Sequence, residues 1–494
     1  MPAPAGALVT RRTWVRLDNA SNIFLAARTD ADPKVFRLSA ETDHYVDPHL
    51  LQAALDTTFD RYPLYHAVLR RGVFWYYLQD SDLRPVVTAE DQYTCAPLYQ
   101  SDRRNLLFRV VHHRRRIILE VFHALSDGTG ALWFLTDLLT AYHRLRYPDP
   151  VRPAAGAREP LGSGTGPGLA DPVAPVVPPG GDASAPTHAL SGDSFRHYFL
   201  RRRQGSTATG SAFRREAAPA TLTAAAGAPS SGAALRGTGA RHSRPRTKVY
   251  RAAGTRTPDN RTRAVELTMP AQRVLELARA EGVSLTMYLI AVFFESLRRS
   301  SGGLGAARTL AASVPVNLRQ FFPSTSARNF FATVRVDHTY GEGPDDVGSV
   351  SRQLDGQFRP KASPEALERK LRRFIRFERM SVLRILPRPL KDLILKLVNG
   401  GTNRGLSVAV SNLGRVSLPE PAASHVGRIL FHVTAVRPQF CAISHAGLLT
   451  ITFTSPFTET AHVRDFARML TARGVDVTVA AARVTEDELA EGEP

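Results

Sequence analysis

Cysteine is nearly missing from this sequence, since its 494 residues include only Cys95 and Cys441. Two cysteines so far apart supply neither the closely spaced ligands of a structural zinc site nor a disulfide framework. We therefore expect no bound metal ion and a reducing, cytoplasmic location.

Long hydrophobic runs are also missing, and the pattern of the first residues does not favour a secretory leader. The longest apolar run covers residues 287–294, far short of the roughly 20 residues that a membrane-spanning helix needs. The first ten residues are small and apolar but carry no charged segment, so we expect no signal peptide. The sequence therefore predicts at most peripheral membrane contact.

Two common catalytic signatures do not occur. The glycine pairs at 302–303 and 400–401 lack the G-x-x-x-x-G-K-[ST] context of a phosphate loop. No G-x-S-x-G nucleophile elbow is present either. The sequence thus gives no support to an NTPase or a serine hydrolase.

Positive charge, by contrast, is abundant, with a formal net charge of +19. Between residues 196 and 263, 15 basic side chains oppose only two acidic ones. Most of this stretch lies in residues 149–248, which are rich in Ala, Gly, Pro, Ser and Arg. Such a composition cannot offset the entropy of ordering, so we expect a largely disordered basic insert. Its few aromatic residues argue against a specific nucleic-acid function, and charge-driven DNA binding stays the third hypothesis.

Regular patterns flank this insert on both sides. Before it, helical spacing marks residues 48–62 and 130–147, and β-rich runs mark residues 73–78, 106–112 and 116–122. After it, the pattern predicts strands at 264–268, 310–316, 331–336, 406–411, 428–436 and 448–454, and helices at 270–281, 284–299 and 462–473.

This mixture predicts an α/β or α+β fold with two lobes. We place the first lobe at residues 1–148, the second at residues 249–485, and an acidic tail at residues 486–494. Ser284 is a suitable N-cap for the helix that follows it.

One short constellation can carry chemistry. The residues HALSDG, 123–128, lie between a predicted strand and a predicted helix. A strand end would hold His123 at a fixed place, and histidine is the side chain whose ordinary pKa suits a general base near pH 7. Asp127 can hold the loop through an arginine partner, and Gly128 permits a tight turn. The alternative is a hydrogen-bonded structural histidine, because so short a motif also arises by chance.

The hexapeptide resembles the H-x-x-x-D-G active-site motif of the condensation-domain and chloramphenicol-acetyltransferase superfamily. Further segments resemble members of that superfamily in the expected order. WVRLDNASNIF (14–24) and FWYYLQ (74–79) are similar to the first lobe of bacterial alcohol acetyltransferase-like proteins. PVNLRQFF (315–322) and NFF (329–331) resemble the start of their second lobe, and SNLG (411–414) resembles a late motif shared with wax-ester and diacylglycerol acyltransferases.

The resemblance implies two chloramphenicol-acetyltransferase-like lobes that form a pseudo-dimer with a channel between them. His123 would deprotonate an alcohol or amine, which attacks the carbonyl of an acyl thioester. The donor would be acyl-CoA, with acetyl-CoA as one candidate, or an acyl carrier protein. Asp127 would be structural, no cofactor would be bound permanently, and a monomer would suffice.

Other residues of the motifs are candidates for supporting roles. Arg319 can pair with a carboxylate such as that of the motif, and its alternative is a solvated loop arginine. Asn412 can donate to an oxyanion, and its alternative is a simple turn that it makes with Gly414. Ser411 belongs to the same SNLG motif. Asn329 precedes a strand, where a cap or a turn is the alternative.

The sequence departs from condensation domains at one position. Their motif usually begins with two adjacent histidines, whereas Phe122 precedes His123 here. The pair His112 and His113 lies on the preceding strand and is no substitute. We therefore favour ester formation by a free-standing enzyme. A non-catalytic scaffold and a carrier-protein-dependent condensation enzyme are the alternatives, and no motif reports the acyl chain length or the acceptor.

Residues 367–397 are both basic and apolar, and Pro387 and Pro389 split them into two helical pieces. Such a stretch can lie on an anionic membrane, or line the entrance for an anionic cofactor such as coenzyme A. We favour a third interpretation, a helix with one buried apolar face and one solvated charged face.

Overall fold

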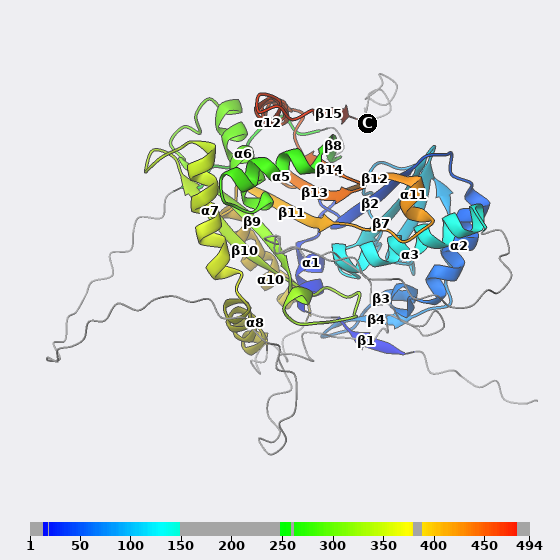
Figure 1. Cartoon of the computed structure of the whole chain (residues 1–494). Coiled ribbons are helices and arrows are strands. Elements are labelled where there is room, and N and C mark those ends of the chain that lie inside the picture. Colours follow the sequence, from blue (N-terminus) through cyan, green and yellow to red (C-terminus); the bar gives the residue numbers. More distant parts are fainter. Residues whose placement is uncertain (1–12, 18, 149–247, 258–260, 379–387, 482–494) are drawn as a thin grey trace, which may run out of the picture.

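The computed structural model describes residues 13–17, 19–148, 248–257, 261–378 and 388–481. Two large sheets with helices packed on them form the two lobes (Figure 1). This is the mixed α/β class that the sequence predicted. Apart from Lys248, the predicted insert and the acidic tail lie outside the described residues.

The first lobe is built on a five-stranded sheet with the order β12-β2-β7-β6-β5. Its strands are β2 (Val35–Thr42), β5 (Thr88–Ala89), β6 (Phe108–His113), β7 (Arg116–Phe122) and β12 (Val426–Val433). The predicted hairpin is confirmed, because β6 and β7 pair antiparallel with Phe108 opposite Val121. Helices α2 (Pro48–Asp60) and α3 (Gly128–Arg146) pack against each other beside this sheet (Figure 1).

Strand β12 corrects a simple division of the lobes by residue number. It falls within residues 249–485, yet it pairs antiparallel with β2 of the first lobe, with Phe431 opposite Leu38. Without this pairing, β2 would end the sheet with an open row of backbone donors and acceptors. Ile429, Leu430 and Phe431 of β12 are buried there, so this strand also completes the apolar interior of the first lobe.

The second lobe is built on a seven-stranded sheet with the order β10-β9-β11-β13-β14-β8-β15. Strand β11 runs parallel to both of its neighbours, and the other pairings are antiparallel. The strands are β8 (Arg263–Pro270), β9 (Thr309–Asn317), β10 (Phe331–Thr339), β11 (Val408–Arg415), β13 (Gln439–His445), β14 (Leu448–Ser455) and β15 (Thr478–Ala481).

Helices pack against this sheet and against one another (Figure 1). They include α5 (Ala271–Ala280), α6 (Leu285–Ser300), α7 (Val347–Lys361) and α12 (Ala461–Thr471). Ser284 lies at the N-cap of α6 as predicted, but its hydroxyl donates to Asp355 Oδ1 (3.2 Å) and does not cap the helix.

The basic apolar stretch forms α8 (Pro364–Glu378) and α10 (Arg388–Arg404), with Pro389 in the first turn of α10, where proline is tolerated. Among the described residues, no single helix is long and apolar enough to cross a membrane. Within the described ranges, one helix pair, α5 and α6 with a bend of 86° between them, reaches that length and composition when taken together.

Small elements of the first lobe lie below its main sheet in Figure 1. Strand β4 (Tyr76–Asp80) is flanked by β1 and β3, and the predicted strand at 73–78 therefore begins later than expected. A hydrogen bond from Gly72 N to Trp75 O (2.8 Å) closes a tight turn just before it. The other elements of this group are β1 (Trp14–Arg16), β3 (Ala67–Arg71), α1 (Asn19–Ala27) and the 3-10 helix Pro63–His66. Helix α11 (Ala422–His425) instead contacts α3 and β12, and the 3-10 helix Leu318–Gln320 contacts β10 of the second lobe.

Each lobe has its own hydrophobic core, and strand β13 belongs to both. Cys441 and Ile443 lie in the core of the first lobe, whereas Phe440 and Ala442 lie in that of the second. Because successive side chains on a strand point to opposite faces, β13 presents one face to each core. The lobes therefore meet along this strand.

Candidate active site

The backbone of His123 is held by two other segments of the chain. His123 follows the last residue of β7, and its N–H donates to Lys34 O (2.8 Å) at the start of β2. Its carbonyl accepts from Asn329 Nδ2 (2.8 Å), which also donates to Ser21 Oγ of α1 (2.9 Å). Asn329 from the second lobe thus fixes the position of His123 in the first.

Three aromatic side chains frame the imidazole ring. The Phe24 ring stacks on it at 3.9 Å between centroids with an interplanar angle of 15°. Phe36 meets it edge-on at 5.1 Å, and Phe331 lies 5.9 Å away. Burial lowers the pKa of His123 to about 4, and the nearby Asp127 and Asn329 side chains act in the opposite direction. His123 is therefore neutral at pH 7 and can accept a proton.

Asp127 joins the first turn of α3 to the second lobe. Its Oδ1 accepts from Gly130 N (2.9 Å) as the N-cap of the helix. Its Oδ2 accepts from Phe330 N (2.8 Å) and from Arg319 Nη1 (2.7 Å). The predicted pairing of Arg319 with this carboxylate is confirmed, and the solvated alternative is wrong.

Arg319 is itself held in place. Its Nη2 donates to the carbonyls of Ser326 (2.8 Å) and Arg328 (2.6 Å). The exposed fractions of the Arg319 and Asp127 side chains are 6% and 7%. Because the oxygens of Asp127 are occupied by these partners, its place in the site is that of a positioning residue.

Two glycines let the lobes approach each other at this loop. A Cβ on Gly128 would lie 2.8 Å from Leu413 Cδ2, the flexible end of a side chain. A Cβ on Gly130 would lie 2.2 Å from the carbonyl oxygen of Ala327. A side chain at position 130 would therefore be tolerated less well than one at position 128. The sequence motif pointed only to Gly128. Leu413 belongs to SNLG, so the H-x-x-x-D-G motif and the last motif of the sequence meet here.

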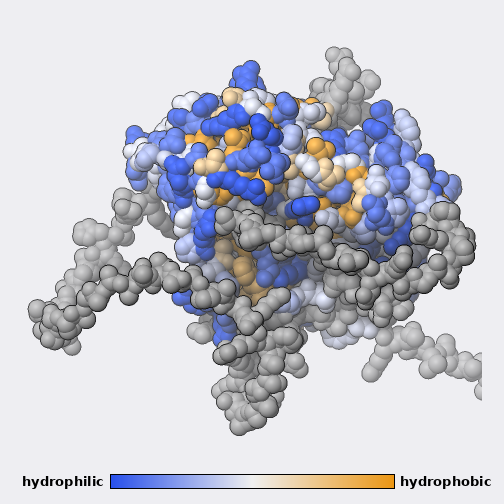
Figure 2. Space-filling view, viewed as in Figure 1, coloured by the Kyte–Doolittle hydropathy of each residue, from blue (hydrophilic) through white to orange (hydrophobic). Residues whose placement is uncertain are grey.

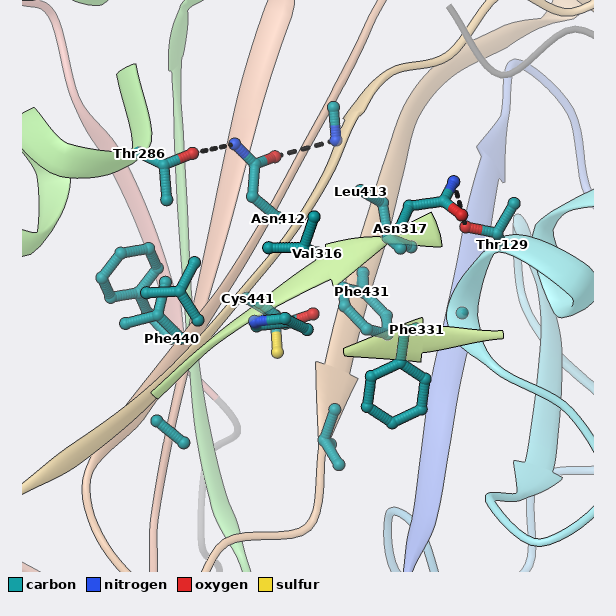
Figure 3. Close-up of a pocket in the computed structure, with 18 of the residues that line it drawn as sticks. Thr129, Thr286, Val316, Asn317, Phe331, Asn412, Leu413, Phe431, Phe440 and Cys441 are labelled. Carbon is teal, nitrogen blue, oxygen red and sulfur yellow. Dashed lines mark hydrogen bonds between the residues drawn. The ribbon is translucent and has the colours of Figure 1, made fainter. Parts of the chain in front are cut away.

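The amide of Asn412 is used within its own surroundings (Figure 3). Its Nδ2 donates to Thr286 Oγ1 (2.9 Å) at the start of α6, and its Oδ1 accepts from Gly414 N (2.8 Å). Gly414 has a φ of +77°, in the region that favours glycine. Ser411 lies beside it on β11, opposite Cys441 of β13. This geometry favours the turn over an oxyanion role for Asn412.

A cavity of about 1800 Å³ lies between the lobes, and His123 is part of its wall. It exceeds the ~300–1,000 Å³ of ordinary ligand pockets. On the face of the molecule that Figure 2 shows, apolar residues gather near the centre, with hydrophilic residues around them. Figure 3 shows the apolar wall, which includes Val316, Phe331, Leu413, Phe431, Phe440 and Cys441.

Polar groups complete the cavity wall. Asn317 Nδ2 at the end of β9 donates to Thr129 Oγ1 of α3 (3.3 Å), a second bridge between the lobes (Figure 3). The cationic side chains of the wall are Lys34, Arg279, Arg359, Arg415 and Arg437. Among the described residues, no group of His, Cys, Asp and Glu side chains could hold a metal ion.

Sequence reasoning missed several of these residues for a common reason. Phe24, Phe36, Thr129 and Asn317 reach the site from four separate elements. Phe24 and Asn317 lay inside segments that resembled the superfamily, but nothing in the segments distinguished them from their neighbours.

No protein-family model matches the chain, and no curated protein sequence does. Solved structures are similar over nearly the whole length. Polyketide synthase associated protein 5 from Mycobacterium tuberculosis has a TM-score of 0.53 and 13% identity, over 92% of this chain and 96% of that one. Trichothecene 15-O-acetyltransferase from Fusarium sporotrichioides has a TM-score of 0.53 and 11% identity, over 95% and 96%.

The starter condensation domain of rhizomide synthetase is equally similar. Its TM-score is 0.53 with 12% identity, over 93% of this chain and 94% of that one. At such low identity the likeness concerns the fold alone. The chain has the two-lobed fold that condensation domains share with chloramphenicol-acetyltransferase-like acetyltransferases, as the sequence resemblance implied.

We predict that the His123 ring takes up its proton near pH 4, because its aromatic surroundings disfavour the charged form. Two-dimensional NMR of protein with labelled histidine would measure this, with His123→Gln to assign the signal. The unfolded chain binds this proton first, below about pH 6.5. Neutral His123 therefore contributes stability that is lost as the pH falls from about 6.5 toward 4. A midpoint near 6.5 in the folded protein would contradict the prediction.

We also predict that Asp127→Asn lowers the free energy of unfolding by about 3 kcal/mol, because it leaves a buried arginine without its counter-charge. The fall in the urea midpoint would measure the loss. Asp60→Asn is the matched control, since Asp60 pairs with Arg84 at the surface with an exposed fraction of 57%. It should cost less than about 1 kcal/mol. Equal shifts for the two variants would refute a dominant role for the buried pair.

Proposed function

We propose that this protein, whose fold is that of condensation domains and related acetyltransferases, is an acyltransferase. It moves an acyl group from acyl-CoA to the hydroxyl of an alcohol, with His123 as the general base. One observation carries the proposal: a neutral imidazole, held by both lobes, faces a cavity of about 1800 Å³ between them.

The proposed reaction needs only one proton relay. His123 accepts the proton of the hydroxyl while the oxygen attacks the carbonyl carbon of the thioester. The tetrahedral intermediate collapses as the carbon–sulfur bond breaks, and the imidazolium returns the proton to the leaving thiolate. An ester and a free thiol result. Binding both substrates in one cavity removes much of the entropic cost of bringing them together.

Two structural neighbours support a coenzyme A thioester as the donor. TRI101 from F. sporotrichioides was solved with coenzyme A and T-2, and the rhizomide synthetase domain was solved with C8-CoA. In the present chain, Arg279, Arg415 and Arg437 line the cavity wall and could attract a phosphorylated donor. The other two cations of the wall, Lys34 and Arg359, pair with Asp32 and Asp355. A thioester on a carrier protein is the second candidate donor.

The residue before His123 supports an alcohol as the acceptor. Phe122 is fully buried and stacks on Tyr99 with 5.6 Å between the centroids. Its side chain therefore belongs to the core of the first lobe and brings no second titratable group to the site. Because Phe122 stands where condensation domains carry a second histidine, a hydroxyl is the acceptor that we favour over an amine.

We predict that His123→Ala lowers kcat/KM for acyl transfer by at least about 100-fold, the usual contribution of a general base. The assay follows thiol release from acyl-CoAs of increasing chain length with a pool of alcohols and amines. Mass spectrometry identifies the ester or amide that forms. His113→Ala is the control, because His113 is an exposed residue at the end of β6.

Each other outcome has a defined meaning. Product formation that survives His123→Ala would overturn the general-base assignment. Binding of acyl-CoA without turnover would support the non-catalytic scaffold. Turnover of carrier-bound thioesters alone would identify a condensation enzyme.

A further inference from the structure

Helix α10 turns a stripe of leucines toward the solvent. Leu390, Leu393 and Leu397 have exposed fractions of 45%, 52% and 67%. Their spacing of three and four residues places them on one face of the helix. The sequence favoured an α10 whose apolar face is buried, and for these three residues that expectation is wrong.

The turn before β4 extends this apolar surface. Lys391 Nζ donates to Phe74 O (3.2 Å) and lies 3.5 Å from the centre of the Trp75 ring. The Tyr76 hydroxyl donates to Asp392 Oδ2 (2.9 Å), which ties the same turn to α10. Val73 and Phe74 within the turn have exposed fractions of 72% and 44%. We call Val73, Phe74, Leu390, Leu393 and Leu397 the leucine surface.

Cations surround the leucine surface. Lys391 and Lys396 lie on α10 between the leucines, and Lys396 is exposed. Arg71 is exposed and directly precedes the turn, and the Arg16 guanidinium lies 3.1 Å from the centre of the Trp75 ring. The nearest acidic group of α10, Asp392, is engaged by Tyr76. Large apolar side chains with cations among them are the chemistry that an anionic bilayer surface accepts.

The opposite face of α10 belongs to the cavity. Asn399 and Asn403 lie one turn apart on that face and line the cavity wall. The helix also packs against α1, whose Ile23 and Phe24 line the cavity as well, and Phe24 stacks on His123. The leucine surface is thus the outer side of a helix whose inner side walls the candidate active site.

We propose that the leucine surface docks on a bilayer that contains anionic phospholipid. The leucines and Phe74 enter the acyl region, and the lysines and arginines contact the headgroups. Docking would set the cavity wall next to the membrane and make membrane-dissolved alcohols or acyl chains the substrate class. This last step rests on the proposed function, whereas docking itself does not.

The test is sedimentation of the full chain with vesicles of phosphatidylcholine, with and without about 30% phosphatidylserine. The test variant combines Leu390→Ser, Leu393→Ser and Leu397→Ser. The control combines Tyr45→Ser, Val86→Ser and Val479→Ser, three residues outside the leucine surface with exposed fractions of 72%, 69% and 54%. Thermal unfolding of both variants checks that the fold is intact. No substrate is present, so the result does not depend on acyl transfer.

We expect the leucine variant to bind anionic vesicles at least about 10-fold more weakly than the wild type, and the control to bind as the wild type does. The basic residues 196–263 can attract vesicles by charge alone, so the difference between the two variants decides the question. Equal binding of both variants would overturn the proposal. So would self-association of the wild type that the leucine variant loses, because a second copy would then cover this surface.

Discussion

The buried ion pair between Asp127 and Arg319 is the interaction on which the site depends. Asp127 caps α3 and so fixes the loop that carries His123, while Arg319 gathers the backbone carbonyls of Ser326 and Arg328 in the second lobe. One carboxylate therefore sets the place of the imidazole in one lobe relative to the cavity wall in the other. If one partner were lost, water could not solvate the charge of the other, since both side chains are nearly buried.

The two lobes are joined along strands as well as at this pair. β13 contributes alternate side chains to both cores, and β12 leaves the second half of the sequence to complete the sheet of the first lobe. The walls of the cavity between the lobes are therefore linked through shared strands and shared cores. The site is therefore preorganised by packing, and Asn329 and Asn317 add hydrogen bonds across the same boundary.

The electrostatic state of His123 comes from its surroundings and not from the carboxylate of its own motif. The stacked Phe24 ring and the neighbouring Phe36 and Phe331 rings replace water around the imidazole, and burial outweighs the attraction of Asp127. The ring consequently stays neutral where a general base must be neutral. The same helix, α1, that supplies Phe24 rests on α10, so the leucine surface and the imidazole are separated by only two packed helices.

The sequence by itself determined the mixed fold class, the β6–β7 hairpin, most helices and strands of the second lobe, and the loop that presents His123. These follow from local periodicity and from short motifs, which act over a few residues. Only the tertiary structure decided that Arg319 pairs with Asp127 and that the Asn412 amide forms a turn with Gly414. It also decided that a side chain is less tolerable at Gly130 than at Gly128, and that β12 pairs with the sheet of the first lobe. Each of these depends on contacts between residues far apart in the chain, and local pattern carries no information about which distant backbone or side chain will arrive there. The exposure of Leu390, Leu393 and Leu397 on α10 was also decided by the tertiary structure. A helix shows its amphipathic pattern in the sequence, but its neighbours decide which face is covered.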